Sequence, residues 1–102
     1  MTSKANAPRR SGQTKQFAKD WKRRAGSGRY DMEELKKVMR LLIENTGPLP
    51  AEYRDHPLKG EWQDHRDCHI AGDWVLIYRI NRFPDGEEVI FVRTGTHAEL
   101  FE

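Results

Sequence analysis

This sequence has only one cysteine, and it lacks long apolar runs and a hydrophobic leader. Each of these features excludes a class of protein. Cys68 is the single cysteine, so no internal disulfide can form, which suits a reducing compartment. No window approaches the roughly 18 consecutive apolar residues that a membrane-spanning helix needs. The N-terminal MTSKANAPRRSGQ has no hydrophobic core region, so it is not a secretory signal. We therefore expect a cytoplasmic protein that makes no contact with a membrane.

Acidic residues are scarce at the N-terminal end. Asp20 is the single acid of residues 1–30, which hold nine lysines and arginines, whereas residues 31–102 hold nine basic and fifteen acidic residues. The first part therefore carries +8 and the second −6, although the net charge of the chain is only +2. Such a basic segment attracts phosphate groups. The alternative is a solvated tail followed by a solvated helix face.

The length and composition predict one small soluble domain. The chain has 102 residues, of which 36% are hydrophobic and 33% charged. The first residues are small, polar and followed by Pro8, a composition typical of a disordered terminus. We expect residues 1–13 to form a flexible basic segment and residues 14–102 to form the domain.

Two helices are predicted at the start of this domain. In TKQFAKDWKRRA, Thr14 is a suitable N-cap and Phe17, Trp21 and Ala25 recur on one face. In DMEELKKVMRLLIEN, Asp31 can cap the helix, and Glu34 follows three residues later as in a capping box. The second helix carries an apolar stripe that we assign to the core: Met32, Leu35, Val38, Met39, Leu42 and Ile43.

The second half of the chain predicts strands. An extended loop over residues 48–63, rich in proline, precedes strands over residues 66–70, 74–80 and 89–94, with NRFPDGEE as a loop between the last two. Thr96 and Glu99 form a second capping-box pattern, which predicts a short helical turn in HAELF. The predicted fold class is α+β, with two N-terminal helices packed on a small twisted antiparallel sheet and a short C-terminal helical turn.

The stretch HRDCHIAGDW concentrates the side chains that could do chemistry. Zinc needs about four ligands at suitable spacing, but Cys68 and His69 are adjacent and would point to opposite faces of a strand. We therefore predict neither a metal nor another cofactor. The remaining alternatives are an acid/base site and the plain polar face of a hairpin.

An acid/base site requires residues from several segments to meet. If the strands form a meander, the loop, the turn and the strand end that carry His56, His69, Asp73 and His97 converge at one rim of the sheet. Histidine can serve as base in one step and as acid in another near neutral pH. Two imidazoles and a carboxylate suit the transesterification of RNA, in which the ribose 2′-OH is the nucleophile and no metal is needed.

Three ordered motifs resemble a known family. The runs LPAEYRDHPLKGEW, RDCHI–GDWVLIYRI and VRTGTHAELF, together with the helix pair, are similar to the YafQ branch of the RelE/ParE toxin superfamily over roughly residues 14–102. The resemblance implies a bacterial type II toxin, a ribosome-dependent endoribonuclease that cuts mRNA in the ribosomal A site. Its implied partners are the ribosome with its rRNA, mRNA, and a cognate antitoxin, for instance in a heterotetramer.

The resemblance also implies roles for individual residues. The histidines of D-H-P-L, R-D-x-H and T-G-T-H are His56, His69 and His97, and the D-W pair is Asp73 and Trp74. The histidines and Asp73 would transfer or orient protons. The implied substrate-binding residues are Trp74, Arg93 and Phe101. The alternative for Trp74 is packing in the core, and the alternative for Arg93 is a structural salt bridge. Phe101 could instead hold the C-terminus against the sheet.

The sequence departs from the family pattern in two places, and two other functions are alternatives. The family begins with a hydrophobic strand, whereas NAPRRSGQTKQF is polar, and the loop NRFPDGEE is longer than the resemblance requires. The same scaffold would suit a ParE-like toxin directed at DNA gyrase, which needs no acid/base cluster. It would also suit a non-catalytic RNA-binding module that uses only the basic first helix.

Overall fold

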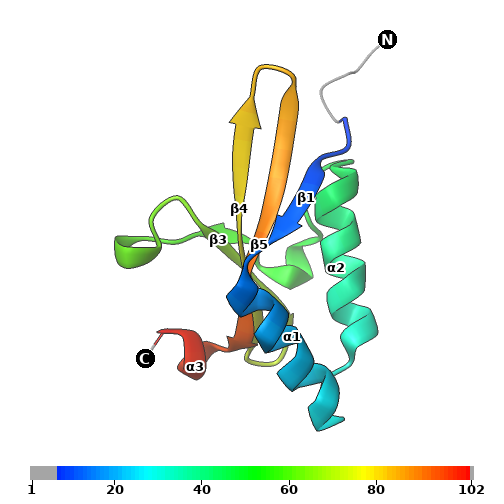
Figure 1. Ribbon diagram of the computed structural model, residues 1–102, viewed down its shortest axis with the longest axis vertical. Helices are drawn as coiled ribbons and strands as arrows, with labels where there is room; N and C mark the ends of the chain where they lie inside the picture. The colour runs from blue at the N-terminus through cyan, green and yellow to red at the C-terminus, as the bar shows by residue number, and fades with distance from the viewer. Residues whose placement is uncertain (1–6, 102) are drawn as a thin grey trace.

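A five-stranded sheet, with strand order β1-β5-β4-β3-β2, forms the centre of the computed structural model, which describes residues 7–101 (Figure 1). Its helices are α1 (Lys15–Ser27), α2 (Met32–Glu44) and α3 (His97–Phe101), and its short 3-10 turns are η2 (Ala51–Tyr53) and η3 (Gly60–Trp62). Its strands are β1 (Arg10–Gln13), β2 (His56–Pro57), β3 (Arg66–Ala71), β4 (Trp74–Phe83) and β5 (Gly86–Thr96). No helix of the described part of the chain is long and apolar enough to cross a membrane.

The predicted sheet, all antiparallel and following two N-terminal helices, is wrong. A strand comes first: β1 precedes α1 and pairs in parallel with β5, from Arg10 opposite Glu88 to Gln13 opposite Phe91, so the sheet is mixed. The sequence RSGQ shows no apolar alternation that would indicate a strand. An edge strand can be held by main-chain hydrogen bonds alone. Arg9 anchors its start, where its N–H donates to the carbonyl oxygen of Ile43 at 2.7 Å. Residues 10–13 of the predicted flexible segment thus belong to the sheet, and residues 1–6 lie outside the described part.

The two long helices are confirmed, with one difference in what they bury. Thr14 caps α1 by accepting from the Phe17 N–H at 2.9 Å, and Asp31 caps α2 by accepting from the Glu33 N–H at 3.1 Å. The carboxylate of Glu34 does not complete a capping box, because it accepts from the Tyr53 hydroxyl at 2.6 Å. The apolar stripe of α2 packs in the core as predicted. Helix α1, in contrast, buries Phe17 together with the charged residues Asp20 and Arg24.

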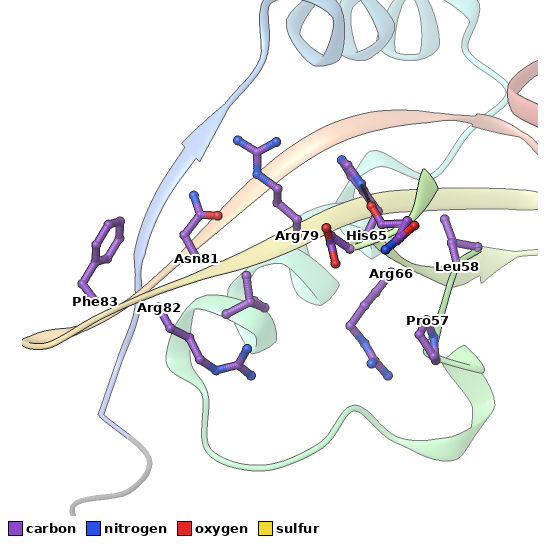
Figure 2. A pocket seen from close by; sticks show the side chains of 11 residues that line it. Pro57, Leu58, His65, Arg66, Arg79, Asn81, Arg82 and Phe83 are labelled. Atoms are coloured by element: carbon purple, nitrogen blue, oxygen red, sulfur yellow. Dashed lines mark hydrogen bonds between the residues drawn. The ribbon is translucent and has the colours of Figure 1, made fainter. Parts of the chain in front are cut away.

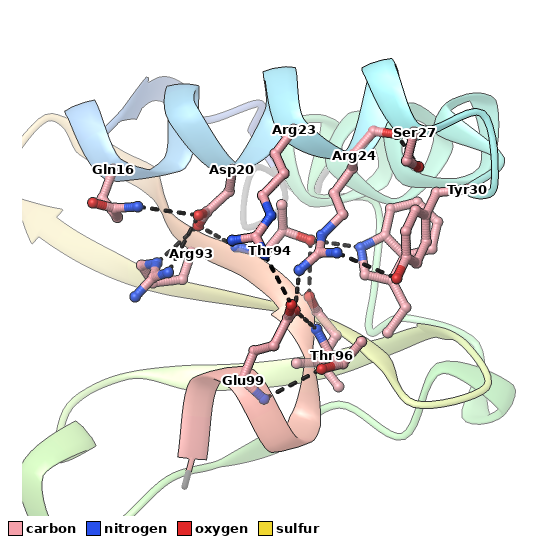
Figure 3. Close-up of polar contacts among 12 residues, drawn as sticks. Gln16, Asp20, Arg23, Arg24, Ser27, Tyr30, Arg93, Thr94, Thr96 and Glu99 are labelled. Atoms are coloured by element: carbon pink, nitrogen blue, oxygen red, sulfur yellow. Dashed lines mark hydrogen bonds and ion pairs between the residues drawn. The ribbon is translucent and has the colours of Figure 1, made fainter.

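Helix α1 covers the edge of β5 beyond the end of β1. There Asp20 accepts from the Thr94 N–H at 3.1 Å and from Arg93 Nε at 2.8 Å (Figure 3). Thr14 donates its hydroxyl to the carbonyl oxygen of Val92 at 2.8 Å. The helix therefore supplies the hydrogen bonds that a neighbouring strand would otherwise make. This explains why a charged residue is buried on its inner face.

A second contact of α1 holds the C-terminal helix. Arg24 is only 7% exposed and forms an ion pair with Glu99, which also accepts from the Thr96 N–H at 2.9 Å (Figure 3). The Glu99 N–H donates in return to the Thr96 hydroxyl at 3.2 Å, so the predicted second capping box is confirmed. Gly95 leaves the space for this contact, because a Cβ there would lie 3.0 Å from both charged groups.

The sheet separates two apolar clusters. Trp74, Leu76 and Tyr78 of β4 face the helices and the main core, whereas Val75 and Ile77 face a smaller cluster with Leu100 of α3. The predicted loop over residues 81–88 is wrong, because β4 and β5 continue through it to a pair between Phe83 and Gly86. Residues 48–63 are also more regular than predicted, since they contain η2, β2 and η3.

Candidate functional site

Three polar side chains meet where β2 pairs with β3. His56 lies opposite Asp67 in the antiparallel register, so both side chains point to the same face of the sheet. His69 follows two residues after Asp67 on the same strand and shares that face. The rings of His56 and His69 lie 6.4 Å apart between centroids. The short strand β2 therefore brings His56 to His69, as predicted.

Asp67 is the buried carboxylate of this group. It is only 1% exposed, and burial raises its pKa above the ordinary value, while the nearby histidines His56, His69 and His97 act in the opposite direction. Its Oδ1 lies 3.2 Å from His56 Nε2, without the alignment of a hydrogen bond, and finds no hydrogen-bond partner among the described residues. A buried carboxylate oxygen without such a partner is costly, and it is a feature found at functional sites.

The ring of His56 has a defined orientation. Its Nδ1 lies 2.8 Å from the carbonyl oxygen of Arg54. Because a carbonyl oxygen only accepts, Nδ1 must carry a proton and donate it. Nε2 then faces the carboxylate of Asp67, and two groups without a proton would repel each other at this distance. A proton on either group would remove this repulsion, and a doubly protonated ring would form an ion pair with Asp67.

His97 lies near Asp67 at the start of α3. It begins α3 and is exposed, and its N–H donates to the carbonyl oxygen of Asp73 at 2.8 Å. Its ring lies 4.6 Å from that of Phe101, which in turn packs edge-on against Trp62 at 6.2 Å. Asp73 thus adjoins His97 through its main chain, and its exposed side chain lies in the turn between β3 and β4.

A small hollow adjoins His69 and is not lined by the other residues of the site. A hollow of about 310 Å³ opens beside His69 and is lined by Glu52, Arg54 and the end of β3. This volume is at the small end of the range for ligand pockets, about 300 to 1,000 Å³. The arrangement offers three imidazoles and one buried carboxylate, which can take up and release protons but can hold only a small part of a substrate.

Two predicted substrate-binding residues lie elsewhere. Trp74 is 2% exposed on the helix face of the sheet, where its Nε1–H donates to the Thr94 hydroxyl at 2.9 Å and its ring contacts Tyr30. Arg93 pairs with Asp20, at 2.8 Å from its Nε. These positions agree with the alternatives of core packing and a structural salt bridge. Of the predicted binding residues, Phe101 alone lies beside a histidine of the site.

Sequence reasoning missed Asp67. The family motif directed attention to Asp73, six residues later. The useful signal was the alternation of R-D-C-H, which places an acidic residue and a histidine side by side on one face. Cys68 points to the opposite face, is fully buried, and has a pKa raised above its usual range by that burial.

The chain matches a known protein family and a characterised relative. The family model described as the bacterial toxin YafQ of type II toxin–antitoxin systems matches residues 9–102. The mRNA interferase toxin YafQ of Escherichia coli is 50% identical over 86 residues, which cover 84% of this chain and 88% of that protein.

Solved structures agree in fold. The crystal structure of Escherichia coli YafQ superposes with a TM-score of 0.82 at 46% identity, covering 92% of this chain and 99% of the other. YafQ in the Escherichia coli DinJ–YafQ complex gives a TM-score of 0.80 at 47% identity, covering 92% and 99%. The chain therefore belongs to the YafQ family of bacterial toxins of type II toxin–antitoxin systems.

Proposed function

We propose that this chain is a ribosome-dependent endoribonuclease that cleaves mRNA in the ribosomal A site, and that a cognate antitoxin neutralises it. The names of its relatives support RNA cleavage, because the Escherichia coli protein is an mRNA interferase toxin and occurs in a complex with DinJ. The observation that carries the proposal is the buried carboxylate of Asp67 among His56, His69 and His97.

The proposed reaction is a transesterification within the RNA chain. A neutral imidazole, on His69 or His97, takes the proton of the ribose 2′-OH, and the 2′ oxygen attacks the adjacent phosphorus. The bond between phosphorus and the 5′ oxygen breaks, and an acid protonates that oxygen. The products are a 2′,3′-cyclic phosphate and a 5′-hydroxyl. Each proton transfer of this kind typically contributes about 10²- to 10⁴-fold.

His56 is suited to the role of the acid. Its side chain is 49% exposed, so a substrate can reach the ring, and the carboxylate of Asp67 lies 3.2 Å from its Nε2. Asp67 keeps the ring oriented and stabilises its positive charge. The cation would also balance the charge that develops on the phosphorane. Phe101, next to His97, would stack on a base, which is worth about 1–3 kcal/mol.

Ribosome dependence is proposed because the site itself positions little. The hollow beside His69 is small and open, and positioning by a larger partner can lower a barrier by about 7–11 kcal/mol. Exposed basic residues of α1 would face rRNA: Lys15, Lys19, Lys22 and Arg23. Arg24, which the sequence placed on the same basic face, is excluded because it is buried against Glu99.

Replacement of His97 tests this proposal. We expect His97→Ala to abolish growth inhibition and to remove the cuts that the wild-type chain makes in translated mRNA, as mapped by primer extension. His65→Ala is the matched control, because His65 contacts Gln63 and Trp62 outside the site and should keep full activity. Unchanged cleavage by a folded His97→Ala variant would contradict the mechanism.

The same experiment separates the alternatives. A gyrase-directed toxin would inhibit growth with intact mRNA and damaged DNA. A module that only binds RNA would leave mRNA uncut and would be indifferent to His97→Ala. The buried carboxylate of Asp67 beside the exposed ring of His56 favours the nuclease, since neither alternative needs it.

A further inference from the structure

A network of three polar side chains supports the short strand β2 from the face of the sheet opposite the histidine site. The carboxylate of Asp55 accepts from Arg66 Nη2 at 2.9 Å and from the hydroxyl of Tyr78. Tyr78 is 2% exposed and faces the main core, whereas His56 and Asp67 face the other side of the sheet. Asp55 directly precedes one residue of the site and Arg66 directly precedes another, so the network and the site lie back to back.

Strand β2 itself has little main chain with which to hold its place. It contains only His56 and Pro57, and proline has no N–H to donate to a neighbouring strand. After the strand, the Leu58 N–H donates to the carbonyl oxygen of His65 at 2.9 Å. Before the strand, the side chain of Asp55 supplies a contact to β3 and β4. The segment is therefore fastened on both sides of the histidine.

The turn that leads into β2 needs such a contact. Arg54 has a φ of 50°, a left-handed conformation that residues other than glycine rarely adopt. Its carbonyl oxygen lies 2.8 Å from His56 Nδ1, while Nε2 faces Asp67. A strained conformation of this kind persists only when the surrounding structure holds it. Because Asp55 is the next residue, its contacts hold the Arg54 carbonyl oxygen beside the ring.

The two donors to Asp55 differ in charge but share a face of the sheet. Burial and the hydrogen bond to Asp55 raise the pKa of Tyr78 above its ordinary value, so its hydroxyl keeps a proton to donate. The hydrogen bond to the same carboxylate raises the pKa of Arg66. Figure 2 shows Arg66 and Arg82 on one side of β4 and Arg79 on the other. Because strand residues alternate, Tyr78 lies on the same side as Arg82.

We propose that Asp55 is a positioning residue for His56, and that Arg66 and Tyr78 hold Asp55 in place for this task. Fixing residue 55 fixes the carbonyl oxygen of Arg54. That oxygen keeps a proton on Nδ1 of the ring and leaves Nε2 facing the buried carboxylate. The proposal rests on the proposed function, because it assigns these residues to the reaction proposed there. A network that served stability alone would not determine which ring nitrogen carries a proton.

Two buried tyrosines provide matched variants. Tyr78→Phe removes the hydroxyl that Asp55 receives, and Tyr53→Phe removes a hydroxyl that donates to Glu34 at 2.6 Å; both rings are 2% exposed. Long-range ¹H–¹⁵N NMR spectra of the full chain show whether Nδ1 of His56 carries a proton. Rings without this proton should be at least fivefold more abundant in Tyr78→Phe and in Asp55→Ala than in the wild type and in Tyr53→Phe. An unchanged abundance in the folded Tyr78→Phe and Asp55→Ala variants would overturn the inference.

The kinetics of mRNA cleavage on programmed ribosomes give a second readout. We expect kcat to fall at least tenfold in Asp55→Ala while KM changes less than twofold, and Tyr53→Phe should keep kcat within twofold. Equal losses in Tyr78→Phe and Tyr53→Phe would assign both hydroxyls to stability and overturn the inference, with the proposed function still standing. If the wild-type chain cuts no mRNA, the proposed function fails, and the protonation of His56 still decides whether Asp55 positions the ring.

Discussion

Asp67 shows how one residue of a strand can determine a site. It is buried at 1% exposure on the same face as His69 and opposite His56, so a carboxylate lies within the histidine group without being open to water. Asp73, which the family motif emphasises, is an exposed turn residue that meets His97 through its carbonyl oxygen. At the residue scale, the two aspartates thus differ in placement: Asp67 is buried within the histidine group, and Asp73 contacts the start of α3 through its main chain.

Asp67→Asn should separate stability from activity. Burial raises the folded-state pKa of Asp67 above the unfolded value near 3.9, so its contribution to stability is complete below about pH 4 and is lost as the pH rises through the raised pKa. We expect the variant to gain stability relative to the wild type as the pH rises above about 4. Urea unfolding measures this gain in stability. Cleavage of mRNA by the Asp67→Asn variant should fall at least tenfold.

The exposed turn residue Asp85 provides the comparison. Asp85→Asn removes a carboxylate of the same type and should leave the pH dependence of unfolding unchanged, because its side chain is 78% exposed. A parallel pH dependence for the Asp67 and Asp85 variants would mean that burial of Asp67 has no energetic effect in the folded state. A fully active Asp67→Asn variant would remove it from the proposed reaction.

At the scale of elements, sequence periodicity predicted the helices well and the sheet less well. The stripe of α2 is apolar at helical spacing, and such a stripe has one physical outcome, burial. Asp20 and Arg24 look solvent-facing in sequence, yet they are buried because they complete the hydrogen bonds of β5 and α3. Strand β1 was invisible because main-chain pairing, not side-chain burial, holds it.

The arrangement of the candidate site depends on the same main-chain pairing. His56, His69 and His97 come from separate segments, and only the pairing of β2 with β3 and the start of α3 bring them together. The motifs identified the residues but gave no strand register. Register decides that Trp74, which follows Asp73 directly, belongs to the helix-side core and not to the site.

Glu99→Ala should loosen the element that carries His97. The hydrogen bond from the Thr96 N–H is the main cause that lowers the pKa of Glu99, and the charge of Arg24 lowers this pKa further. Burial of Glu99 acts in the opposite direction. A lowered pKa means stability that is present above the unfolded value, near 4.3, and is lost as the pH falls through the folded value. We expect a loss of about 1 kcal/mol at pH 7, the usual cost of a cap, which shrinks below pH 4 in thermal unfolding.

Two variants show which contact of Glu99 is responsible. Glu99→Gln keeps an acceptor for the Thr96 N–H but removes the charge that Arg24 meets, so it should retain part of the stability. Glu44→Ala, at an exposed position near the end of α2, should change neither stability nor mRNA cleavage. Cleavage that falls equally in the Glu44 and Glu99 variants would contradict a specific link between the Arg24 contact and His97.

At the scale of the whole molecule, charge is divided between two regions. The N-terminal residues 1–30 carry +8 and the remainder carries −6. Of the basic residues on α1, Lys15, Lys19, Lys22 and Arg23 stay exposed, whereas the histidine site lies at the ends of β3 and β5. The exposed basic residues of α1 and the histidine group therefore lie on different elements. Binding to RNA and cleavage of RNA should respond to different substitutions.

Reversing two charges on α1 tests this division. Lys19→Glu with Lys22→Glu should weaken binding to ribosomes at least tenfold and reduce the slope of log affinity against log salt by roughly two, because each lysine that meets a phosphate contributes about one. The pair Lys37→Glu and Arg40→Glu makes the same change in net charge on α2, and both positions are exposed. If both pairs weaken binding equally, the net charge of the molecule and not the face of α1 governs ribosome binding. A loss confined to the α1 pair, with the histidine site unaltered, would establish that recognition and chemistry occupy separate surfaces.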